Sequence, residues 1–218
     1  QINPDHAMAY SNLGTILKDL GKFKEAESSF RKAIEIKPDI AEAHSNLGNI
    51  LREFGKLKEA EFSTRKAIEI NPDYALAHSN LGGILKNLGK LKEAEFFILK
   101  AIELNPNLAR AYFALSTIPY SKKNTIWKNN LFSESILKNK SKADQVDIYF
   151  ARANILHKEK RYEESSNYLK LANRIKLITK PSSANQIINK SRLLLIEYQK
   201  NFLKKKKYKD YPQCIFIV

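Results

Sequence analysis

A 34-residue period dominates the first half of this 218-residue chain. Prolines, a Leu-Gly pair, a further glycine and two alanines all recur at that interval. A fixed period of this length indicates a chain that stacks one small helical or strand unit many times, and it constrains the fold more than any local pattern does. The repeated positions are Pro4, Pro38, Pro72 and Pro106; Leu13, Leu47 and Leu81; Gly14, Gly48 and Gly82; Gly21, Gly55 and Gly89; Ala26, Ala60 and Ala94; Ala33, Ala67 and Ala101.

The first part of each unit predicts a helix. In the first unit, Tyr10, Leu13, Gly14 and Leu17 stand at spacings that place them on one helical face. Gly21 should end this helix, because glycine readily adopts the left-handed conformation that closes a helix C-terminus.

The second part of each unit predicts another helix, which Pro38 ends. Asp39 then stands where it could cap the first helix of the next unit. Neither helix can bury its apolar stripe alone, so stacked units must supply the core. The stripe of this second helix consists of Phe23, Ala26, Phe30 and Ala33.

These residues resemble the tetratricopeptide repeat, a 34-residue helix–turn–helix. The resemblance covers three regular units over residues 7–40, 41–74 and 75–108. It implies an all-α fold, a right-handed superhelical α-solenoid in which small residues such as Gly14 and Ala26 let paired helices approach closely. The sequence departs from the pattern where His44 and His78 replace the aromatic Tyr10, and where Thr64 and Ile98 replace Phe30.

The regularity breaks after Pro106. A first helix begins at Ala109, but Pro119 stands where a leucine is expected and should interrupt it. Residues 125–132 favour a helix, and regular features return over 149–175, where Arg152 replaces the repeated leucine. We therefore expect two degenerate units over 109–180, followed by a closing helix (187–198) and a basic linker within 181–210.

The last eight residues, 211–218, form a short run of β-branched and aromatic residues after a proline, which is typical of a buried strand. A single terminal strand has no partner, so we expect an orphan strand. At the other end, Gln1–Pro4 matches Glu69–Pro72 and Glu103–Pro106, the end of a unit. Both ends indicate a fragment of a longer protein.

This order of elements resembles the bacterial tetratricopeptide-containing sulfotransferases. There, a repeat array and a degenerate unit similar to 149–173 are followed by a strand like Ile215–Val218 and a loop of the form G-x-P-R-S-G-[ST]. The resemblance implies that the loop would hold the phosphosulfate of 3′-phosphoadenosine 5′-phosphosulfate. This chain stops before that loop, so no catalytic or cofactor-binding residue can be assigned and the chain itself is not expected to be an enzyme. Its expected role is to recruit the acceptor for the missing C-terminal domain.

Polar residues recur on the first helices, beside the apolar stripes. We expect them to line the concave surface, where an asparagine amide can both donate to and accept from an extended peptide. This ladder resembles the array of O-linked N-acetylglucosamine transferase; the alternative is a solvated face. A neighbouring basic column would favour an acidic peptide or, equally, be solvated. A free-standing peptide-binding adaptor is the alternative function. The ladder consists of Asn12, Asn46, Asn80, Ser11, Ser45, Ser79 and Asn49, and the basic column of Lys18, Arg52 and Lys86.

The net charge of +15 belongs to the second half alone, because residues 1–108 contain 15 basic and 15 acidic residues. The run Lys204–Lys207 could grip phosphate or form a solvated linker, and no nucleic-acid motif accompanies it, so we do not expect nucleic acid as a partner. His44 and His78 are expected to pack rather than to bind metal, because no cysteine or acidic cluster accompanies them.

Compartment and membrane association follow from what the sequence lacks. No run of about 18 apolar residues predicts a membrane span. A single cysteine, Cys214, excludes a disulfide framework. Gln1–Pro4 shows no secretory signal, so a cytoplasmic location is expected.

Overall fold

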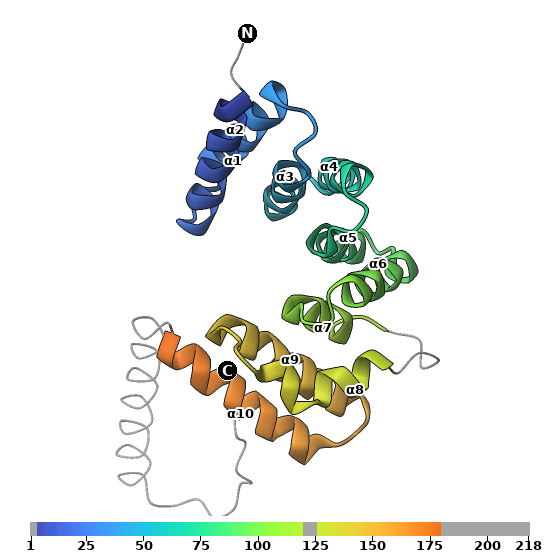
Figure 1. Ribbon diagram of the computed structural model, residues 1–218. Coiled ribbons are helices and arrows are strands. Elements are labelled where there is room, and N and C mark those ends of the chain that lie inside the picture. Colours follow the sequence, from blue (N-terminus) through green and yellow to red (C-terminus); the bar gives the residue numbers. More distant parts are fainter. Residues whose placement is uncertain (1–3, 120–125, 180–218) are drawn as a thin grey trace, which may run out of the picture. The chain divides into compact units, whose positions relative to one another are not determined.

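The computed structural model describes residues 4–119 and 126–179. Every regular element within those two ranges is helical, and the helices follow one another as hairpins from α1 to α6 (Figure 1). This confirms the predicted all-α solenoid, while the strand over 211–218, the helix over 187–198 and Lys204–Lys207 lie outside the described residues. The helices of the three regular units are α1 (Pro4–Asp19), α2 (Phe23–Ile36), α3 (Ala41–Glu53), α4 (Leu57–Ile70), α5 (Ala75–Asn87) and α6 (Leu91–Leu104).

The irregular part has shorter and less even helices. After α7 the chain forms a short helix and a single 3-10 turn before a long pair of helices. The helix predicted over 125–132 is found from Ile126 onward, and the interruption expected at Pro119 is real, because α7 already ends at Ser116. The elements are α7 (Ala109–Ser116), α8 (Ile126–Phe132), η1 (Glu134–Leu137), α9 (Lys142–Lys158) and α10 (Tyr162–Thr179).

Residues up to Asn173 form one compact unit, and of the second unit, which begins at Arg174, only the C-terminal end of α10 is described. None of the described helices is both long and apolar enough to cross a membrane.

Glycines shape the regular units at two kinds of position. Gly21, Gly55 and Gly89 close the first helices with φ of 74°, 73° and 76°, the left-handed region that side chains disfavour. Within the first helices, a Cβ added at Gly48 would lie 2.1 Å from Thr64 Oγ1 of the paired helix. The close approach predicted from the Gly14 position is therefore confirmed, and it holds where threonine replaces the phenylalanine.

The expectation that Asp39 caps the following helix is wrong. The residue that precedes α3 is Ile40, and no side chain accepts a hydrogen bond from the helix N-terminus there. Asp39 lies one residue too early and instead forms an ion pair of 4.0 Å with Lys37. A side-chain cap does occur in the irregular part, where Ser141 Oγ accepts from the Asp144 amide of α9 at 3.1 Å.

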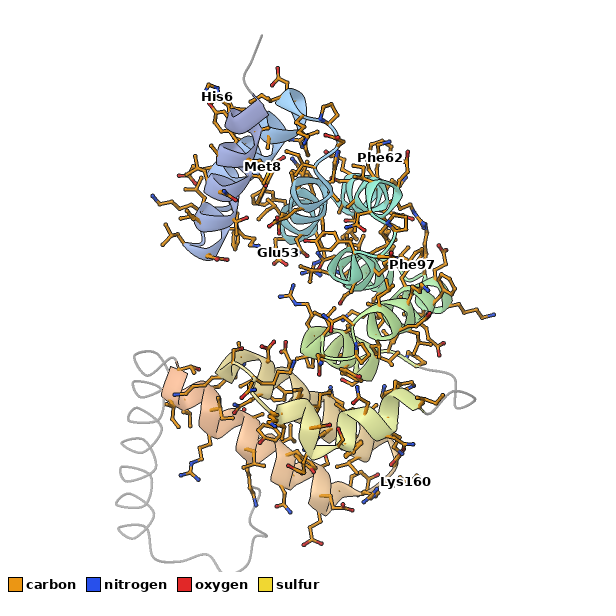
Figure 2. All side chains as sticks on the ribbon, viewed as in Figure 1. His6, Met8, Glu53, Phe62, Phe97 and Lys160 are labelled. Carbon is orange, nitrogen blue, oxygen red and sulfur yellow. The ribbon has the colours of Figure 1, made fainter. Side chains whose placement is uncertain are left out.

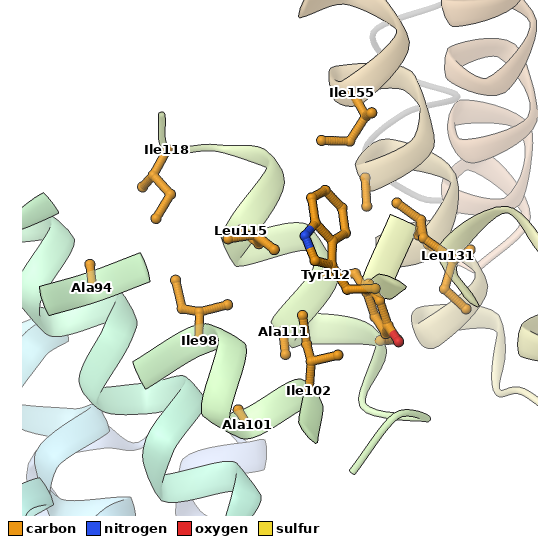
Figure 3. Packing of buried hydrophobic residues seen from close by; sticks show 14 of the residues in the cluster. Ala94, Ile98, Ala101, Ile102, Ala111, Tyr112, Leu115, Ile118, Leu131 and Ile155 are labelled. Atoms are coloured by element: carbon orange, nitrogen blue, oxygen red, sulfur yellow. The ribbon is translucent and has the colours of Figure 1, made fainter. Parts of the chain in front are cut away.

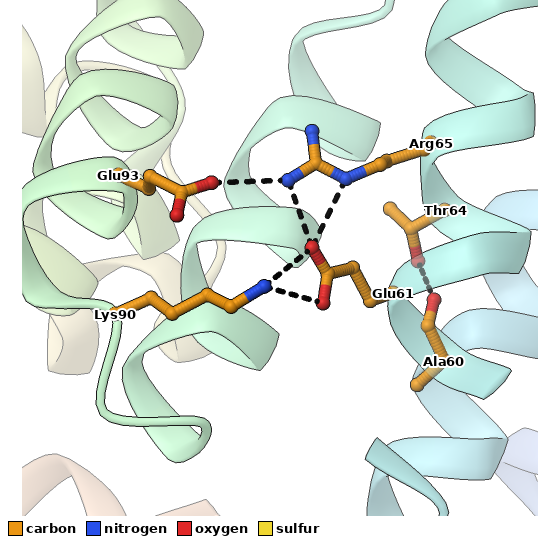
Figure 4. Close-up of polar contacts among 6 residues, drawn as sticks. All are labelled: Ala60, Glu61, Thr64, Arg65, Lys90 and Glu93. Atoms are coloured by element: carbon orange, nitrogen blue, oxygen red, sulfur yellow. Dashed lines mark hydrogen bonds and ion pairs between the residues drawn. The ribbon is translucent and has the colours of Figure 1, made fainter. Parts of the chain in front are cut away.

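Ion pairs join successive regular units at the second helices. Glu61 accepts from Arg65 on its own helix at 2.8 Å and from Lys90 of the next unit at 3.1 Å, while Arg65 also reaches Glu93 at 3.1 Å (Figure 4). Burial works to raise the pKa of Glu61, but the hydrogen bonds from Arg65 and Lys90 outweigh it and the pKa is lowered.

The same network recurs one unit earlier in the chain. Arg31 binds Glu27 at 2.8 Å and Glu59 at 3.5 Å, and Lys56 binds Glu27 at 3.4 Å. We call this recurring set, Glu27–Arg31–Lys56–Glu59 and Glu61–Arg65–Lys90–Glu93, the charge ladder.

The apolar core continues without a break from the regular into the irregular part. Ile98 and Ala101 of α6 pack with Tyr112 and Leu115 of α7, and Leu131 of α8 joins the same cluster (Figure 3). The first helix of the irregular part is thus stacked like its predecessors even though it is shorter.

Candidate functional site: a polar groove on the first helices

The first helices α3, α5 and α7, together with α9, line a polar groove of about 460 Å³. Figure 2 shows Glu53 of this groove and the exposed Phe62 of α4 on opposite sides of the array. The groove therefore lies on the side of the first helices, the side on which the sequence predicted binding. Its lining residues are Asn49, Arg52, Glu53, Ser79, Asn80, Gly83, Lys86, Asn87, Arg110, Phe113, Ala114, Thr117 and Asp147.

Three basic side chains enter this groove, one from each of α3, α5 and α7. They are Arg52, Lys86 and Arg110, and they face two acidic residues, Glu53 and Asp147. Basic residues thus outnumber acidic ones, which favours an anionic ligand.

Arg52 and Lys86 each make one weak polar contact within the protein. Arg52 forms an ion pair with its neighbour Glu53 at 3.0 Å, and Lys86 Nζ donates to Thr117 Oγ1 at 3.3 Å. A Cβ added at Gly83 would lie 2.9 Å from Arg52 Nη1, so glycine leaves room for the guanidinium to lie against α5. Partly exposed pairs of this kind are worth little and can be exchanged for contacts to a ligand.

An unsatisfied acceptor lies beside these charges. Asn49 Oδ1 is buried and accepts no hydrogen bond from any described residue. A buried acceptor left unpaired is destabilising, and a ligand N–H or a bound water would remove that cost. Because Asn49 lines the groove, a peptide amide lying along α3 and α5 could supply the missing donor once the Asn49 side chain turns its buried oxygen toward the groove.

Half of the predicted binding residues come together in the groove. Asn49, Arg52, Ser79, Asn80 and Lys86 line it.

The other predicted residues lie elsewhere. Ser11, Ser45 and Asn46 are buried, Asn12 is exposed, and Lys18 Nζ donates to Asn46 Oδ1 at 3.1 Å. None of these five lines this groove.

The asparagine ladder makes bonds between units. Asn80 Nδ2 donates to Ser45 Oγ of the preceding unit at 2.9 Å, in a fully buried contact. Asn46 is likewise bonded to Lys18 of the preceding unit. These amides therefore hold neighbouring first helices together, and binding of a peptide by the ladder as a whole stays a prediction.

Sequence reasoning missed Arg110, Phe113 and Asp147. Arg110 occupies the position that Leu76 holds in the preceding unit, so no repeated basic column pointed to it. In the register that places Arg152 on the repeated leucine, Asp147 stands at this same position, where no residue type recurs. Extending the first-helix positions of the regular units into α7 would have found Phe113, which stands one period after Ser79, but not Arg110.

The two histidines occupy packing positions in successive units. Nε2 of His44 lies 2.8 Å from the Pro38 carbonyl oxygen, and Nε2 of His78 lies 2.7 Å from that of Pro72. The hydroxyl of Tyr112 donates in the same way to the Pro106 carbonyl, at 2.9 Å. Over the described ranges, no three His, Cys, Asp or Glu side chains gather as metal ligands.

Comparison with known families identifies the repeat. Three sequence profiles, each described as "Tetratricopeptide repeat", match residues 5–73, 75–108 and 146–177, together more than half of the chain. The segment between the last two matches contains α7 and α8, the least regular part of the array. No curated protein sequence matches the chain.

Solved structures show the same fold. One similar structure is the "First TPR of Spaghetti (RPAP3) bound to HSP90 peptide SRMEEVD", with 25% identity and a TM-score of 0.51 over 53% of this chain and 92% of that one. Another is the NMR structure of the first TPR domain of human RPAP3, with 23% identity and a TM-score of 0.51 over 63% of this chain and 100% of that one.

Proposed function

Because the chain belongs to the tetratricopeptide-repeat family, we propose that it is a protein-interaction scaffold that binds an extended acidic peptide in the polar groove. The observation that carries this proposal is the buried, unpaired Asn49 Oδ1 in a groove that also holds Arg52, Lys86 and Arg110. The orphan acceptor fits a peptide N–H, and the bases fit carboxylates.

A solved relative supports the peptide chemistry. The tetratricopeptide domain described as bound to the HSP90 peptide SRMEEVD holds a segment with two glutamates and one aspartate. The polar groove of this chain is lined by three basic side chains that could bind such a segment. In this proposal the chain acts by binding alone.

The finer expectation, that the array recruits an acceptor for a sulfotransferase domain, stays a prediction. It depends on the sequence of residues 211–218, which lie outside the described residues, and the profiles that match the chain are tetratricopeptide-repeat profiles.

The test is a direct binding measurement. Fluorescence anisotropy would compare a labelled panel of extended heptapeptides that includes SRMEEVD and its amide counterpart SRMQQVN, in which side-chain amides replace the three carboxylates. We expect the acidic peptides to bind more tightly, with an affinity that falls as salt is added. The double variant Arg52→Ala/Arg110→Ala should weaken acidic-peptide binding by about tenfold or more, since it removes two charge-assisted contacts.

The matched control is Lys92→Ala, an exposed lysine of α6 that does not line the groove. Its affinity should equal that of the unaltered protein. Equal binding of the acidic peptide and its amide counterpart, or an equal loss in the Lys92→Ala control, would contradict the proposal. Asn49→Ala tests the orphan acceptor separately and should weaken both peptide classes alike.

A further inference from the structure

A second pocket, of about 600 Å³, is lined by residues of α2, α3 and α4. Ile34, Leu47 and Leu51 form an apolar part of its wall, and two basic and two acidic residues line it as well. The pocket shares no lining residue with the polar groove. It is therefore a separate feature of the array, to which the proposed binding of an acidic peptide assigns no role.

The wall of this pocket recurs one unit later with a single change. Nine of its ten lining residues are followed 34 positions later by an identical residue. The exception is Ser63, whose counterpart is Phe97. We call the pocket the Ser63 pocket. The equivalent site, formed by α4, α5 and α6, shows which side chain such a wall accommodates.

In the equivalent site the ring of Phe97 lies against three side chains. It stacks on His78, with the ring centroids 5.8 Å apart and the planes 28° from parallel. The guanidinium of Arg65 lies 5.4 Å from the centre of the Phe97 ring, and Phe96 meets the ring edge to face at 5.2 Å. Contacts of these kinds stabilise an aromatic ring beyond the gain from burying its surface.

The counterparts of all three side chains line the Ser63 pocket. They are His44, Arg31 and Phe62. His44 is partly exposed, whereas His78, beneath the ring of Phe97, is only 5% exposed. Phe62 is 77% exposed, and Ser63 Oγ donates to the His44 main-chain oxygen at 2.9 Å. The three partners of an aromatic ring are thus in place, and the residue that would supply the ring is a serine.

We propose that the Ser63 pocket binds a phenylalanine side chain of a partner protein, in the place that Phe97 takes one unit later. The ring stacks on His44, the guanidinium of Arg31 lies over it, and Phe62 meets its edge. The pocket is larger than a phenyl ring, so it also holds main chain on either side of the phenylalanine, which favours a polypeptide over a small aromatic molecule. The lining charges balance, so an uncharged side chain fits.

The first experiment uses the blocked tripeptide acetyl-Gly-Phe-Gly-amide as the probe. It is titrated into the isotope-labelled full chain, and binding is followed by the NMR shifts of the backbone amides. We expect the shifts to centre on His44 and Ser63. Acetyl-Gly-Ala-Gly-amide should bind about tenfold more weakly or less, because a methyl group removes far less apolar surface from water than a phenyl ring does. Equal binding of the two peptides, or shifts centred elsewhere, would overturn the proposal.

A matched pair of variants tests the site itself. Ser63→Phe fills the pocket as Phe97 fills its own site, and should weaken probe binding about tenfold or more. The control is Ser28→Phe, at an exposed serine of α2 that does not line the pocket, and it should leave the affinity unchanged. The converse variant, Phe97→Ser, should create a second probe site with shifts at His78. Undiminished binding to Ser63→Phe, or a Phe97→Ser protein without the second site, would contradict the proposal.

Two further measurements separate the other occupants. Benzyl alcohol is titrated in the same way, and tighter binding than that of the phenylalanine tripeptide would assign the pocket to a small aromatic molecule instead. Light scattering is compared for the unaltered protein and Ser63→Phe. A dimer that Ser63→Phe dissociates would assign the pocket to a second copy of this chain. Weaker binding of benzyl alcohol and a monomer in both proteins are the results that we expect.

Discussion

The regular units α1–α6 and the irregular part α7–α10 both bury an apolar core between stacked helices, but different contacts hold the helices together. Between regular units, contacts recur with the period of the sequence: Glu27 and Glu61 each receive a lysine from the unit that follows. In the irregular part, three long basic side chains instead donate to main-chain oxygens in contacts that the regular units do not contain. A solenoid can therefore lose its period without losing its core, provided that specific bonds replace the repeated ones.

Arg152 is the clearest of these specific bonds. It stands where the regular units have a leucine, yet it is only 2% exposed. Its Nε donates to the Leu131 carbonyl and its Nη2 to the Ser133 carbonyl, both at 2.8 Å, and its guanidinium lies over the rings of Phe132 and Tyr168. The arginine thus fastens the end of α8, where the helix has stopped and left carbonyls without helical partners.

Other long side chains of this region act similarly. Lys158 Nζ donates to the Ile118 carbonyl and Lys140 Nζ to the Asn107 carbonyl, each at 2.6 Å. Both acceptors lie just beyond a helix end, so the bonds occur where the helical ladder of hydrogen bonds is missing.

The largest expected effect comes from restoring the repeated leucine at position 152. Arg152→Leu restores the residue type of Leu13, Leu47 and Leu81 but removes the donors to the buried Leu131 carbonyl and the partly buried Ser133 carbonyl. We expect a loss of about 2–4 kcal/mol of unfolding free energy, measured by urea denaturation. Arg161→Leu, at an exposed arginine, is the control and should change stability little. A stabilised Arg152→Leu protein would contradict this expectation, since it would mean that the repeated leucine position still determines packing in this region.

A smaller effect should separate the two regions at one repeat position. Gly48→Ala would place a methyl group 2.1 Å from Thr64 Oγ1 and should cost about 1–3 kcal/mol by overpacking. The equivalent residue of the irregular part is Ser116, which donates to the Phe113 carbonyl at 2.7 Å and accepts from Asn154 at 3.0 Å. Ser116→Ala should cost only about 1 kcal/mol, the value of its hydrogen bonds. Equal losses in the two variants would show that helix spacing is the same in both regions.

The smallest effect concerns the charge ladder and depends on pH. The pKa of Glu61 is held below its ordinary value of 4.5 in the folded protein. A lowered folded-state pKa contributes stability above pH 4.5, and that contribution is lost as the pH falls through the folded value. Glu61→Gln should therefore cost about 0.5–1 kcal/mol at neutral pH and progressively less in acid. Urea midpoints measured between about pH 3 and 7 would show this convergence with the unaltered protein, and a constant gap would contradict it.

The regular fold was readable from the sequence because it is periodic. The positions of Gly21, Pro38 and their repeats fixed helix ends to within a residue or two, and the early end of α7 followed from Pro119. The cap by Asp39 was predicted wrongly because Asp39 lies one residue before Ile40, the N-cap position of α3. Composition does not place a helix start to within one residue. The buried role of Arg152 could not be predicted either, because its acceptors are carbonyls far away in the sequence.

The groove was only partly predictable for a related reason. Repetition pointed to Arg52 and Lys86, since each is the counterpart of the other in a neighbouring unit. It could not point to Arg110 or Asp147, which occur once and reach the groove through stacking of α7 and α9. Repetition also predicted more ligand-binding asparagines than line the groove. A recurring polar position can bond the neighbouring unit as well as a ligand.

The interfaces of the charge ladder are asymmetric. Each interface joins unlike surfaces, a glutamate and arginine on one side and a lysine and glutamate on the other. Such heterologous contacts cannot close on themselves around a two-fold axis, and they extend in one direction only. Any assembly built through this ladder is therefore polar and head to tail, with the two ends of the row chemically distinct and unable to pair with themselves.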